Sequence, residues 1–130
     1  MKHTVEVAAA VLFRQGRLLI TQRLPDSHLS GLWELPGGKR KPGESIRECL
    51  VREIREELDI RVVVGELFEA IEYEYPEKTV CLKFFRCRYE DGNIRALGCQ
   101  RFAWVRPDEL DNYPFPPANE PVMQKLRSSG

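Results

Sequence analysis

The run GKRKPGESIRECLVREIREELDI, from Gly38 to Ile60, carries the clearest helix signal in the chain. It predicts a helix from Ser45 to about Asp59, because Ser45 and Glu48 form a capping box directly after Pro42-Gly43. Apolar side chains recur along it at intervals of three and four residues, which is the period of a helix with one buried face. They are Ile46, Cys49, Leu50, Ile54 and Leu58. We therefore expect this helix to bury that face in the core.

Three carboxylates lie at the edge of the apolar face. At about 100° per residue, Glu57 falls inside the apolar stripe, and Glu53 and Glu56 fall on its flank. A solvated face of mixed charge is one interpretation, and it explains the other charged residues of the helix well. It explains Glu57 poorly, because a carboxylate is seldom buried without a partner. Oxygen-rich clusters suit Mg2+ or Mn2+, so on the residues alone a metal site and a solvated face both stay open.

Strand patterns flank the helix on both sides. Upstream, Thr4–Phe13 and Leu18–Gln22 are predicted to be strands joined by a turn at Gln15-Gly16, and Pro25–Gly43 is predicted to be a loop. The elements predicted downstream are extended structure over Arg61–Tyr75 with a bulge at Gly65, a turn at Pro76–Lys78, strands at Thr79–Tyr89 and Phe102–Val105, a hairpin turn at Asp91-Gly92, a short helix at Pro107–Leu110, a connector at Pro114–Pro117, a final helix over Ala118–Leu126, and a frayed end over Arg127–Gly130. This order predicts an α+β protein or a mixed α/β sandwich.

The composition limits the class of protein. A chain of 130 residues, 42% apolar and 31% charged, is typical of one globular domain, here residues 1–130. Basic and acidic residues number 20 each, which argues against a partner of polymeric nucleic acid but permits a small anion such as a nucleotide. The run Val7–Phe13 is short and follows Glu6, so we expect neither a signal peptide nor a membrane span.

The four cysteines form no C-x2-C pair. They are Cys49, Cys81, Cys87 and Cys99. We expect reduced thiols that behave as small buried apolar side chains, and a cytoplasmic location.

Residues 38 to 60 also fit the Nudix box, G-x5-E-x7-R-E-U-x-E-E-x-G-U, in which U is a bulky aliphatic residue. The fixed positions that match are Gly38, Glu44, Arg52, Glu53, Ile54, Glu56, Glu57 and Ile60. The one departure is Asp59, where the box has glycine, and we expect Asp59 to adopt a positive φ after the helix. The sequence therefore resembles the Nudix hydrolases.

This resemblance implies a Nudix fold, a mixed β-sheet sandwiched between α-helices. It also implies hydrolysis of a nucleoside diphosphate linked to another group, with Mg2+ or Mn2+ as the cofactor. The implied metal ligands are Glu53, Glu56, Glu57 and the carbonyl of Gly37. Glu53 is also a candidate base for the attacking water, Arg52 would orient Glu53, and Lys39 and Glu44 would lie at the mouth of the site. The chemistry agrees, because cleavage of a phosphoanhydride needs charge neutralisation and positioning more than covalent catalysis.

Segments outside the box resemble the Nudix enzymes that hydrolyse 8-oxo-dGTP, over about residues 4 to 127. They are Leu19–Arg23, Ser27-His28, Glu34–Lys39, Glu72–Pro76 and Phe115–Val122. The implied reaction converts 8-oxo-dGTP to 8-oxo-dGMP and pyrophosphate, which keeps oxidised guanine out of DNA. The implied nucleotide pocket comprises Arg23, His28, Glu34, Leu35, Pro36, Gly37, Lys39, Lys78 and Asn119.

Several pocket residues have simpler explanations. Arg23 could be a surface residue, His28 an incidental loop histidine, and Asn119 a helix N-cap. The chain also departs from the enzymes that it resembles, with Leu35 in place of an aromatic residue and Lys78 in place of arginine. Residues 96–100 lack the carboxylate that those enzymes place before the last strand.

Two other functions stay open. Nudix enzymes of similar size hydrolyse CTP, dCTP or 5-methyl-dCTP with the same box, and some Nudix-like domains only recognise nucleotides. The second alternative is disfavoured, because such modules generally lose box carboxylates and Glu53, Glu56 and Glu57 are all present. We expect a small nucleoside triphosphate as the partner, no membrane, and a monomer, with a dimer as the alternative.

Overall fold

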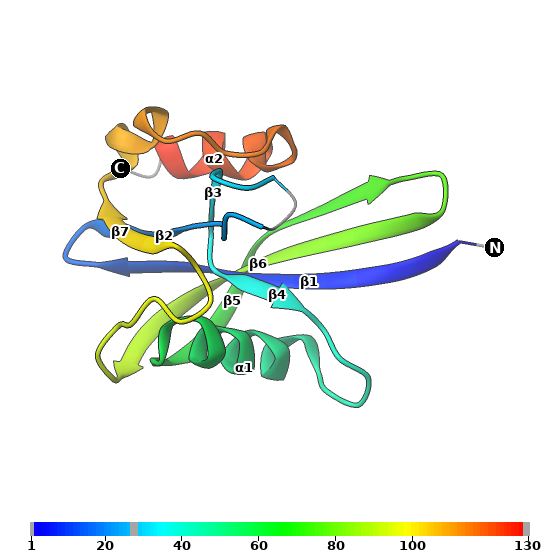
Figure 1. Ribbon diagram of the computed structural model, residues 1–130, viewed down its shortest axis with the longest axis horizontal. Coiled ribbons are helices and arrows are strands. Elements are labelled where there is room, and N and C mark those ends of the chain that lie inside the picture. The colour runs from blue at the N-terminus through cyan, green and yellow to red at the C-terminus, as the bar shows by residue number, and fades with distance from the viewer. Residues whose placement is uncertain (1, 27–28, 129–130) are drawn as a thin grey trace.

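The computed structural model describes residues 2–26 and 29–128, and it shows a mixed sheet between two helices (Figure 1). Its elements, in chain order, are β1 (His3–Arg14), β2 (Arg17–Gln22), β3 (Trp33–Glu34), β4 (Gly37–Lys39), α1 (Ile46–Leu58), β5 (Arg61–Glu74), β6 (Lys78–Asp91), β7 (Arg101–Val105), the 3-10 helices η1 (Pro107–Asn112) and η2 (Pro117–Asn119), and α2 (Glu120–Arg127). The predicted fold class is confirmed.

Strand β1 is the strand that joins the two parts of the sheet. The order is β3-β2-β1-β6-β5, with β4 also paired to β1 and β7 also paired to β2. β1 and β6 run parallel from His3 to Leu12, whereas every other pair is antiparallel. The last two residues of β1, Phe13 and Arg14, pair with β2. β1 therefore contacts the strands of both parts.

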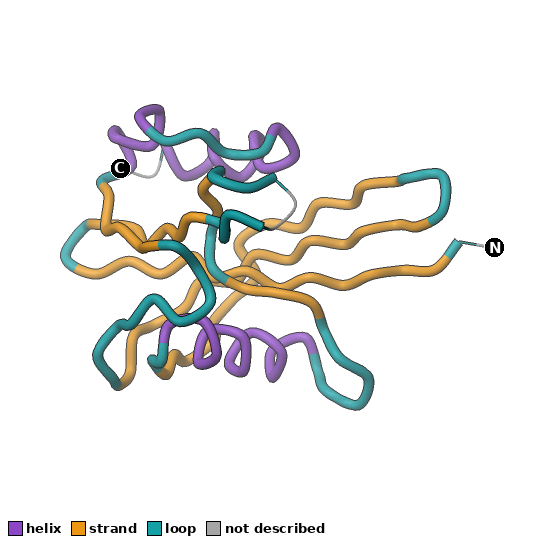
Figure 2. Tube along the Cα trace, in the orientation of Figure 1, coloured by secondary structure: helices purple, strands orange, loops and turns teal. Residues whose placement is uncertain are grey.

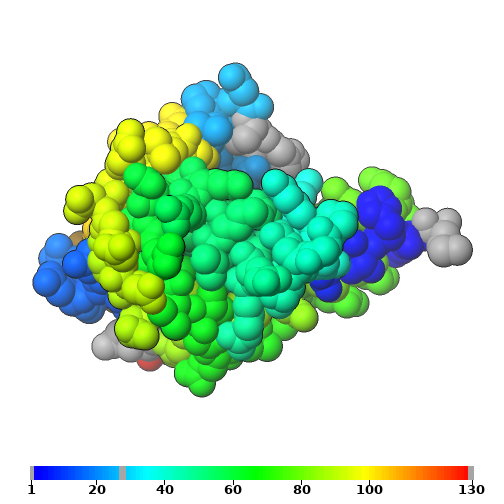
Figure 3. Space-filling model, turned by 90° about the horizontal axis from the view of Figure 1, so that it is seen from below, coloured from blue at the N-terminus to red at the C-terminus, as the bar shows by residue number. Residues whose placement is uncertain are grey.

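The two helices lie on opposite sides of the sheet (Figure 2). The core has two clusters of apolar side chains, one under each helix. Successive residues of a strand point to opposite faces, so Ala8, Ala10 and Leu12 face α1, while Ala9 and Val11 face α2. On α1, the buried residues are Cys49, Leu50, Ile54 and Leu58, as the apolar period predicted. Figure 3 shows the α1 face, where the helix and the loop before it, in cyan and green, cross the middle of the molecule.

Helix α1 begins and ends as its sequence predicts. The amide of Ser45 donates to Glu48 Oε1 at 2.8 Å and the amide of Glu48 donates to Ser45 Oγ at 3.0 Å, which completes the capping box. Asp59 follows the helix with a φ of 59° and donates its amide to the Arg55 carbonyl. The register of β5 on β6 shifts between Val64 and Leu67, which confirms the predicted bulge around Gly65.

Three predictions from the sequence are wrong. The predicted loop Pro25–Gly43 contains β3 and β4, which are too short and too rich in glycine and proline to show a strand pattern. Asp91-Gly92 does not turn a hairpin, because the end of β6 pairs with β5 and the next strand, β7, pairs with β2. Arg127 is not frayed: it ends α2 and contacts Glu120 at 2.8 Å and Asp111 at 2.9 Å. Residues 129 and 130 lie outside the described residues.

The cysteines are all free, as expected. Cys49 and Cys99 are buried, while Cys81 and Cys87 are half-buried. Burial raises the pKa of the Cys49 and Cys99 thiols to about 11, with nearby carboxylates adding to the effect. Such thiols are protonated at neutral pH and are therefore weak nucleophiles. Within the described residues, no helix is both long enough and apolar enough to cross a bilayer.

Candidate active site

A cavity of about 600 Å³ lies against β1 and β4 and receives side chains from both helical sides of the sheet. Its wall contains eight of the residues predicted from the sequence: Arg23, Glu34, Leu35, Gly37, Lys39, Glu53, Glu57 and Asn119. The predicted residues Pro36, Glu44, Arg52, Glu56 and Lys78 do not line it. His28 lies outside the described residues. The chain therefore brings two of the box carboxylates, Glu53 and Glu57, to one cavity with part of the predicted nucleotide pocket.

Two glycines of β4 make room for the site. The position that a Cβ of Gly38 would occupy is taken by the carboxylate of Glu53, so glycine lets Glu53 lie directly on β4. A Cβ on Gly37 would instead meet the backbone of Ala8 and Ala9, where β4 pairs with β1. Glycine at 37 therefore permits the strand pairing, and glycine at 38 permits the position of a side chain.

Glu57 is the most strongly perturbed carboxylate of the site. Burial raises its pKa to about 8, and the negative charges of Glu34 and Glu53 add to the effect, while a hydrogen bond from the Gly37 amide opposes it. Gly98 packs against the Glu57 side chain, and the amides of Leu97 and Gly98 donate to the Glu57 carbonyl at 2.8 and 3.0 Å. The loop before β7 thus fixes the end of α1 but adds no carboxylate of its own.

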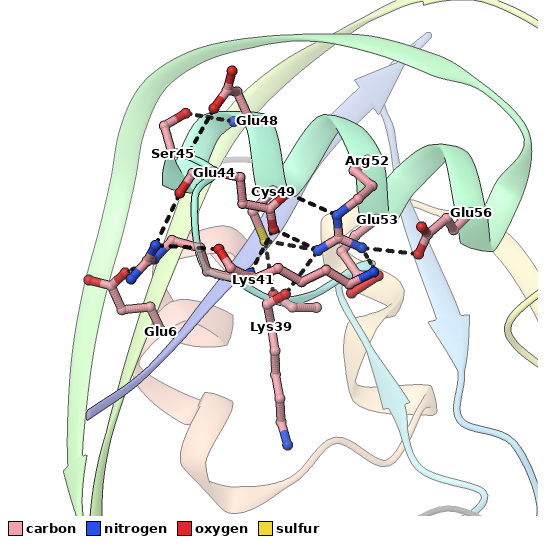
Figure 4. A network of polar contacts seen from close by, with 12 residues as sticks. Glu6, Lys39, Lys41, Glu44, Ser45, Glu48, Cys49, Arg52, Glu53 and Glu56 are labelled. Atoms are coloured by element: carbon pink, nitrogen blue, oxygen red, sulfur yellow. Dashed lines mark hydrogen bonds and ion pairs between the residues drawn. The ribbon is translucent and has the colours of Figure 1, made fainter. Parts of the chain in front are cut away.

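Arg52 is the centre of an ion-pair network on the outer side of α1 (Figure 4). Its guanidinium donates to Glu44 Oε2 at 3.0 Å and Oε1 at 2.8 Å, and to Glu56 Oε1 at 3.0 Å. It also lies 3.4 Å from Glu53 Oε1. The hydrogen bonds from Arg52 lower the pKa of Glu44 to about 2, so this carboxylate is ionised at any working pH. Glu53 is the member of the network that also faces the cavity.

Glu56 is placed differently from the other two box carboxylates. Its side chain is 55% exposed, against 18% for Glu53, and it contacts Arg52 one turn earlier on the helix. Among residues 2–26 and 29–128, no group of three acidic, histidine or cysteine side chains is arranged to hold a metal ion. The donor atoms at the cavity are nevertheless carboxylate oxygens on Glu53 and Glu57, which is the chemistry that Mg2+ prefers. The residues therefore fit a hard divalent cation, and the role of Glu56 stays a prediction.

Arg23 and Glu34 form an ion pair in the wall of the cavity. The guanidinium of Arg23 lies 2.8 Å from Glu34 Oε1, and both side chains are more than two-thirds buried. Burial raises the pKa of Glu34, and the charge of Arg23 opposes this rise. The interpretation of Arg23 as a plain surface residue is therefore not supported.

Asn119 lies at the N-cap position of α2, but its side chain does not cap the helix. It precedes α2 at the end of η2, and its side chain makes no capping hydrogen bond. Its backbone is in the right-handed helical region, with φ −87° and ψ −5°, whereas an N-cap is usually extended. The structure therefore gives the Asn119 side chain no capping hydrogen bond, and Asn119 lies in the cavity wall.

The apolar part of the wall was not predicted from the sequence. Val80, Leu82 and Phe84 line it from alternate positions of β6, and Tyr75 lines it from the turn directly after β5. The alternation along β6 was the available signal, because alternate residues of a strand share a face. Lys78 lies outside this wall, with its Nζ 5.9 Å from the centre of the Tyr75 ring.

A family model described as a NUDIX domain matches residues 7–125. The chain therefore belongs to the Nudix family of hydrolases, as a pyrophosphohydrolase.

Two relatives of this chain are named for different substrates. Over 120 residues the chain is 38% identical to a CTP pyrophosphohydrolase of Escherichia coli (strain K12), and the match covers 92% of this chain and 89% of that protein. Over 124 residues the chain is 34% identical to the 8-oxo-dGTP diphosphatase of the same organism, and the match covers 95% of this chain and 96% of that protein. The solution structure of the E. coli ORF135 protein matches with a TM-score of 0.83 at 37% identity, covering 98% of this chain and 94% of that one. MutT from Methanosarcina mazei Go1 matches with a TM-score of 0.85 at 26% identity, covering 98% and 96%.

Proposed function

We propose that this chain hydrolyses 8-oxo-dGTP to 8-oxo-dGMP and pyrophosphate in the cytoplasm, and so keeps oxidised guanine out of DNA. The observation that carries this substrate is the uncapped side chain of Asn119 in the cavity wall. Guanine has an acceptor at N7, whereas 8-oxoguanine carries a proton there. An amide offers one donor group and one acceptor, so Asn119 can donate to O6 and accept the N7 proton.

In the proposed reaction, Glu53 and Glu57 would hold Mg2+, or Mn2+ in its place, with Glu56 and the Gly37 carbonyl as further candidate ligands. When bound, this ion neutralises phosphate charge and acidifies water. The carboxylate of Glu53 takes the proton of the water that attacks one phosphorus of the α–β anhydride. The bond from that phosphorus to the bridging oxygen breaks, which releases the monophosphate and pyrophosphate. Arg52 holds Glu53 in place, because it is itself fixed by Glu44.

The test compares kcat/KM for 8-oxo-dGTP and dGTP with Mg2+, in the wild type and in Asn119→Ala. Ordinary guanine would place a lone pair against the Asn119 carbonyl, and sites built on one hydrogen bond can reject such an analogue by roughly 10^4. We therefore expect a strong wild-type preference for 8-oxo-dGTP that collapses in Asn119→Ala. Asn112→Ala, an exposed asparagine at the end of η1, is the matched control and should keep the preference. A wild type with no preference would refute the substrate, and a preference that survives Asn119→Ala would refute the role of Asn119.

A pyrimidine nucleotide is the second candidate substrate. It is favoured by the 38% identity to a protein named CTP pyrophosphohydrolase. The buried aliphatic Leu35 in the wall also favours it, because leucine offers less stacking surface to a purine than an aromatic ring does. The same assay with CTP, dCTP and 5-methyl-dCTP separates the two candidates, since the true substrate should give the highest kcat/KM.

A further inference from the structure

The segment between β4 and α1 is a tight turn closed in two ways. The amide of Glu44 donates to the Lys41 carbonyl at 3.3 Å, with Pro42 and Gly43 between them and a φ of +87° at Gly43. In return, the amide of Lys41 donates to Glu44 Oε1 at 2.8 Å. Proline followed by glycine at positive φ is the preferred sequence for such a turn. The backbone of Lys41 is therefore held in one position.

This turn is also tied to the catalytic helix. The Glu44 carboxylate that closes the turn is the one that receives two hydrogen bonds from Arg52. Arg52 donates in addition to the Lys39 carbonyl at 3.1 Å and lies 3.4 Å from Glu53. Any displacement of Lys41 relative to Glu53 would therefore break several charge-assisted hydrogen bonds.

The cations around this turn are not equivalent. Arg52 is engaged by three glutamates, and Arg40 is engaged by Glu6 and by the Glu44 carbonyl. Across the part of the chain that the structure describes, neither Lys39 nor Lys41 has a carboxylate within ion-pair distance. Lys41 is exposed and extends from the turn toward Glu53 (Figure 4). Burial raises the pKa of Glu53, and the positive charge of Lys41 is among those that counteract this rise.

The residues that line the cavity indicate which part of a bound nucleotide would lie near Lys41. Asn119 lies in the wall on the α2 side, whereas Glu53 and Lys39 lie in the wall on the α1 side. Lys41 does not line the cavity, but it lies two residues after Lys39, which does, on the turn that leads out of β4. A nucleotide with its base at Asn119 and its scissile anhydride at Glu53 would extend its remaining phosphates toward Lys41.

We propose that the Lys41 ammonium binds the terminal phosphates of the substrate and so favours nucleoside triphosphates over shorter nucleotides. This inference rests on the proposed function, but on no particular base. An ammonium on a flexible stem suits this role, because it is a compact charge that can follow phosphate oxygens which differ in position between substrates. Because Lys41 forms no ion pair with a carboxylate in the described structure, it would break no ion pair on binding phosphate oxygens.

The experiment measures dissociation constants by calorimetry, with Mg2+, for an α,β-methylene analogue of 8-oxo-dGTP and for 8-oxo-dGMP. For Lys41→Gln we expect the constant of the triphosphate analogue to rise about tenfold, since one charge-assisted hydrogen bond is lost. The constant for 8-oxo-dGMP should stay within about twofold, because 8-oxo-dGMP has no terminal phosphates. Lys41→Arg should largely restore the wild-type value. Arg55→Gln, an exposed cation on the last turn of α1, is the matched control and should bind both ligands as the wild type does.

Hydrolysis of 8-oxo-dGTP, CTP, dCTP and 5-methyl-dCTP by the wild type is measured in parallel, so that the two proposals can fail separately. If the wild type hydrolyses one of these triphosphates but Lys41→Gln binds the triphosphate analogue normally, the role of Lys41 is refuted and the proposed function stands. Equal weakening of 8-oxo-dGMP and the triphosphate analogue would also refute the role of Lys41, because it would show a general effect on the site. A wild type that neither binds the analogue nor hydrolyses any of these triphosphates would overturn both.

Discussion

Gly37 and Gly38 are neighbours in β4, yet a methyl group at each would meet a different kind of obstacle. At Gly37 the obstacle is the backbone of β1, which cannot move without breaking the strand pairing. At Gly38 it is the far end of the Glu53 side chain, which can rotate away. The same substitution should therefore damage the fold at one position and the site at the other.

We predict that Gly38→Ala folds with nearly wild-type stability but loses about a hundredfold in kcat. Glu53 is the proposed catalytic base, and small misplacements of a catalytic group have costs of this size. Gly37→Ala should instead lose most of its stability, since its Cβ meets main-chain atoms. Thermal melting and steady-state kinetics on both variants check the prediction. A Gly38→Ala enzyme of normal kcat would show that Glu53 need not lie against β4.

At the scale of the element, helix α1 ends in a residue that is poorly suited to its conformation. Asp59 has a φ of 59°, and its negative charge lies at the negative end of the helix dipole. The Asp59 carboxylate lies 3.5 Å from the guanidinium of Arg95. Both side chains are exposed, and an exposed ion pair contributes little to stability.

Asp59→Gly should therefore raise the free energy of unfolding by about 1 kcal/mol and leave activity unchanged. Asp108→Gly is the control, because Asp108 is exposed in η1 and is not among the residues with positive φ, so glycine there should lower stability. Urea unfolding of both variants tests the pair. A less stable Asp59→Gly would mean that the contact with Arg95 outweighs the strain.

The elements differ in how far sequence could predict them, and the reason is the range of the interactions that form them. Helix α1 was predictable because its cap and its apolar period are local. Strands β3 and β4 were not, because their residues become strands only by pairing with β2 and β1. The same distinction applies to the candidate site. The box carboxylates were predictable from their spacing in the sequence. The contact of Glu56 with Arg52, and the absence of a capping hydrogen bond from the Asn119 side chain, were not, because they depend on how the side chains pack.

At the scale of the whole molecule, the two apolar clusters share strand β1 and should not unfold separately. Each cluster contains its own fluorescent reporter. Trp33 is buried in the cluster under α2, and Trp104 packs against the cluster under α1. Both tryptophans lie on strands that pair with β2.

We predict that the variants Trp33→Phe and Trp104→Phe, each with one remaining tryptophan, unfold in urea with coincident fluorescence and circular dichroism transitions. Adding Leu12→Ala, which opens a cavity under α1, should cost about 2–5 kcal/mol by either reporter. Trp33 would report this loss only if the two clusters are coupled through the sheet. Two separate midpoints would instead mean that one side of the sheet melts first.

The placement of the cavity between the two sides of the sheet also bears on how such enzymes diversify. The carboxylates come from the α1 side, whereas Asn119 comes from the α2 side, and each side is stabilised by its own cluster. After a gene duplication, substitutions near Asn119 and Leu35 would change the α2 side of the cavity, where we propose that the base binds, while the carboxylates on α1 stay in place. Such divergence would produce relatives that are similarly identical to this chain but are named for different nucleotides. The relatives named for CTP and for 8-oxo-dGTP, at 38% and 34% identity, fit this expectation.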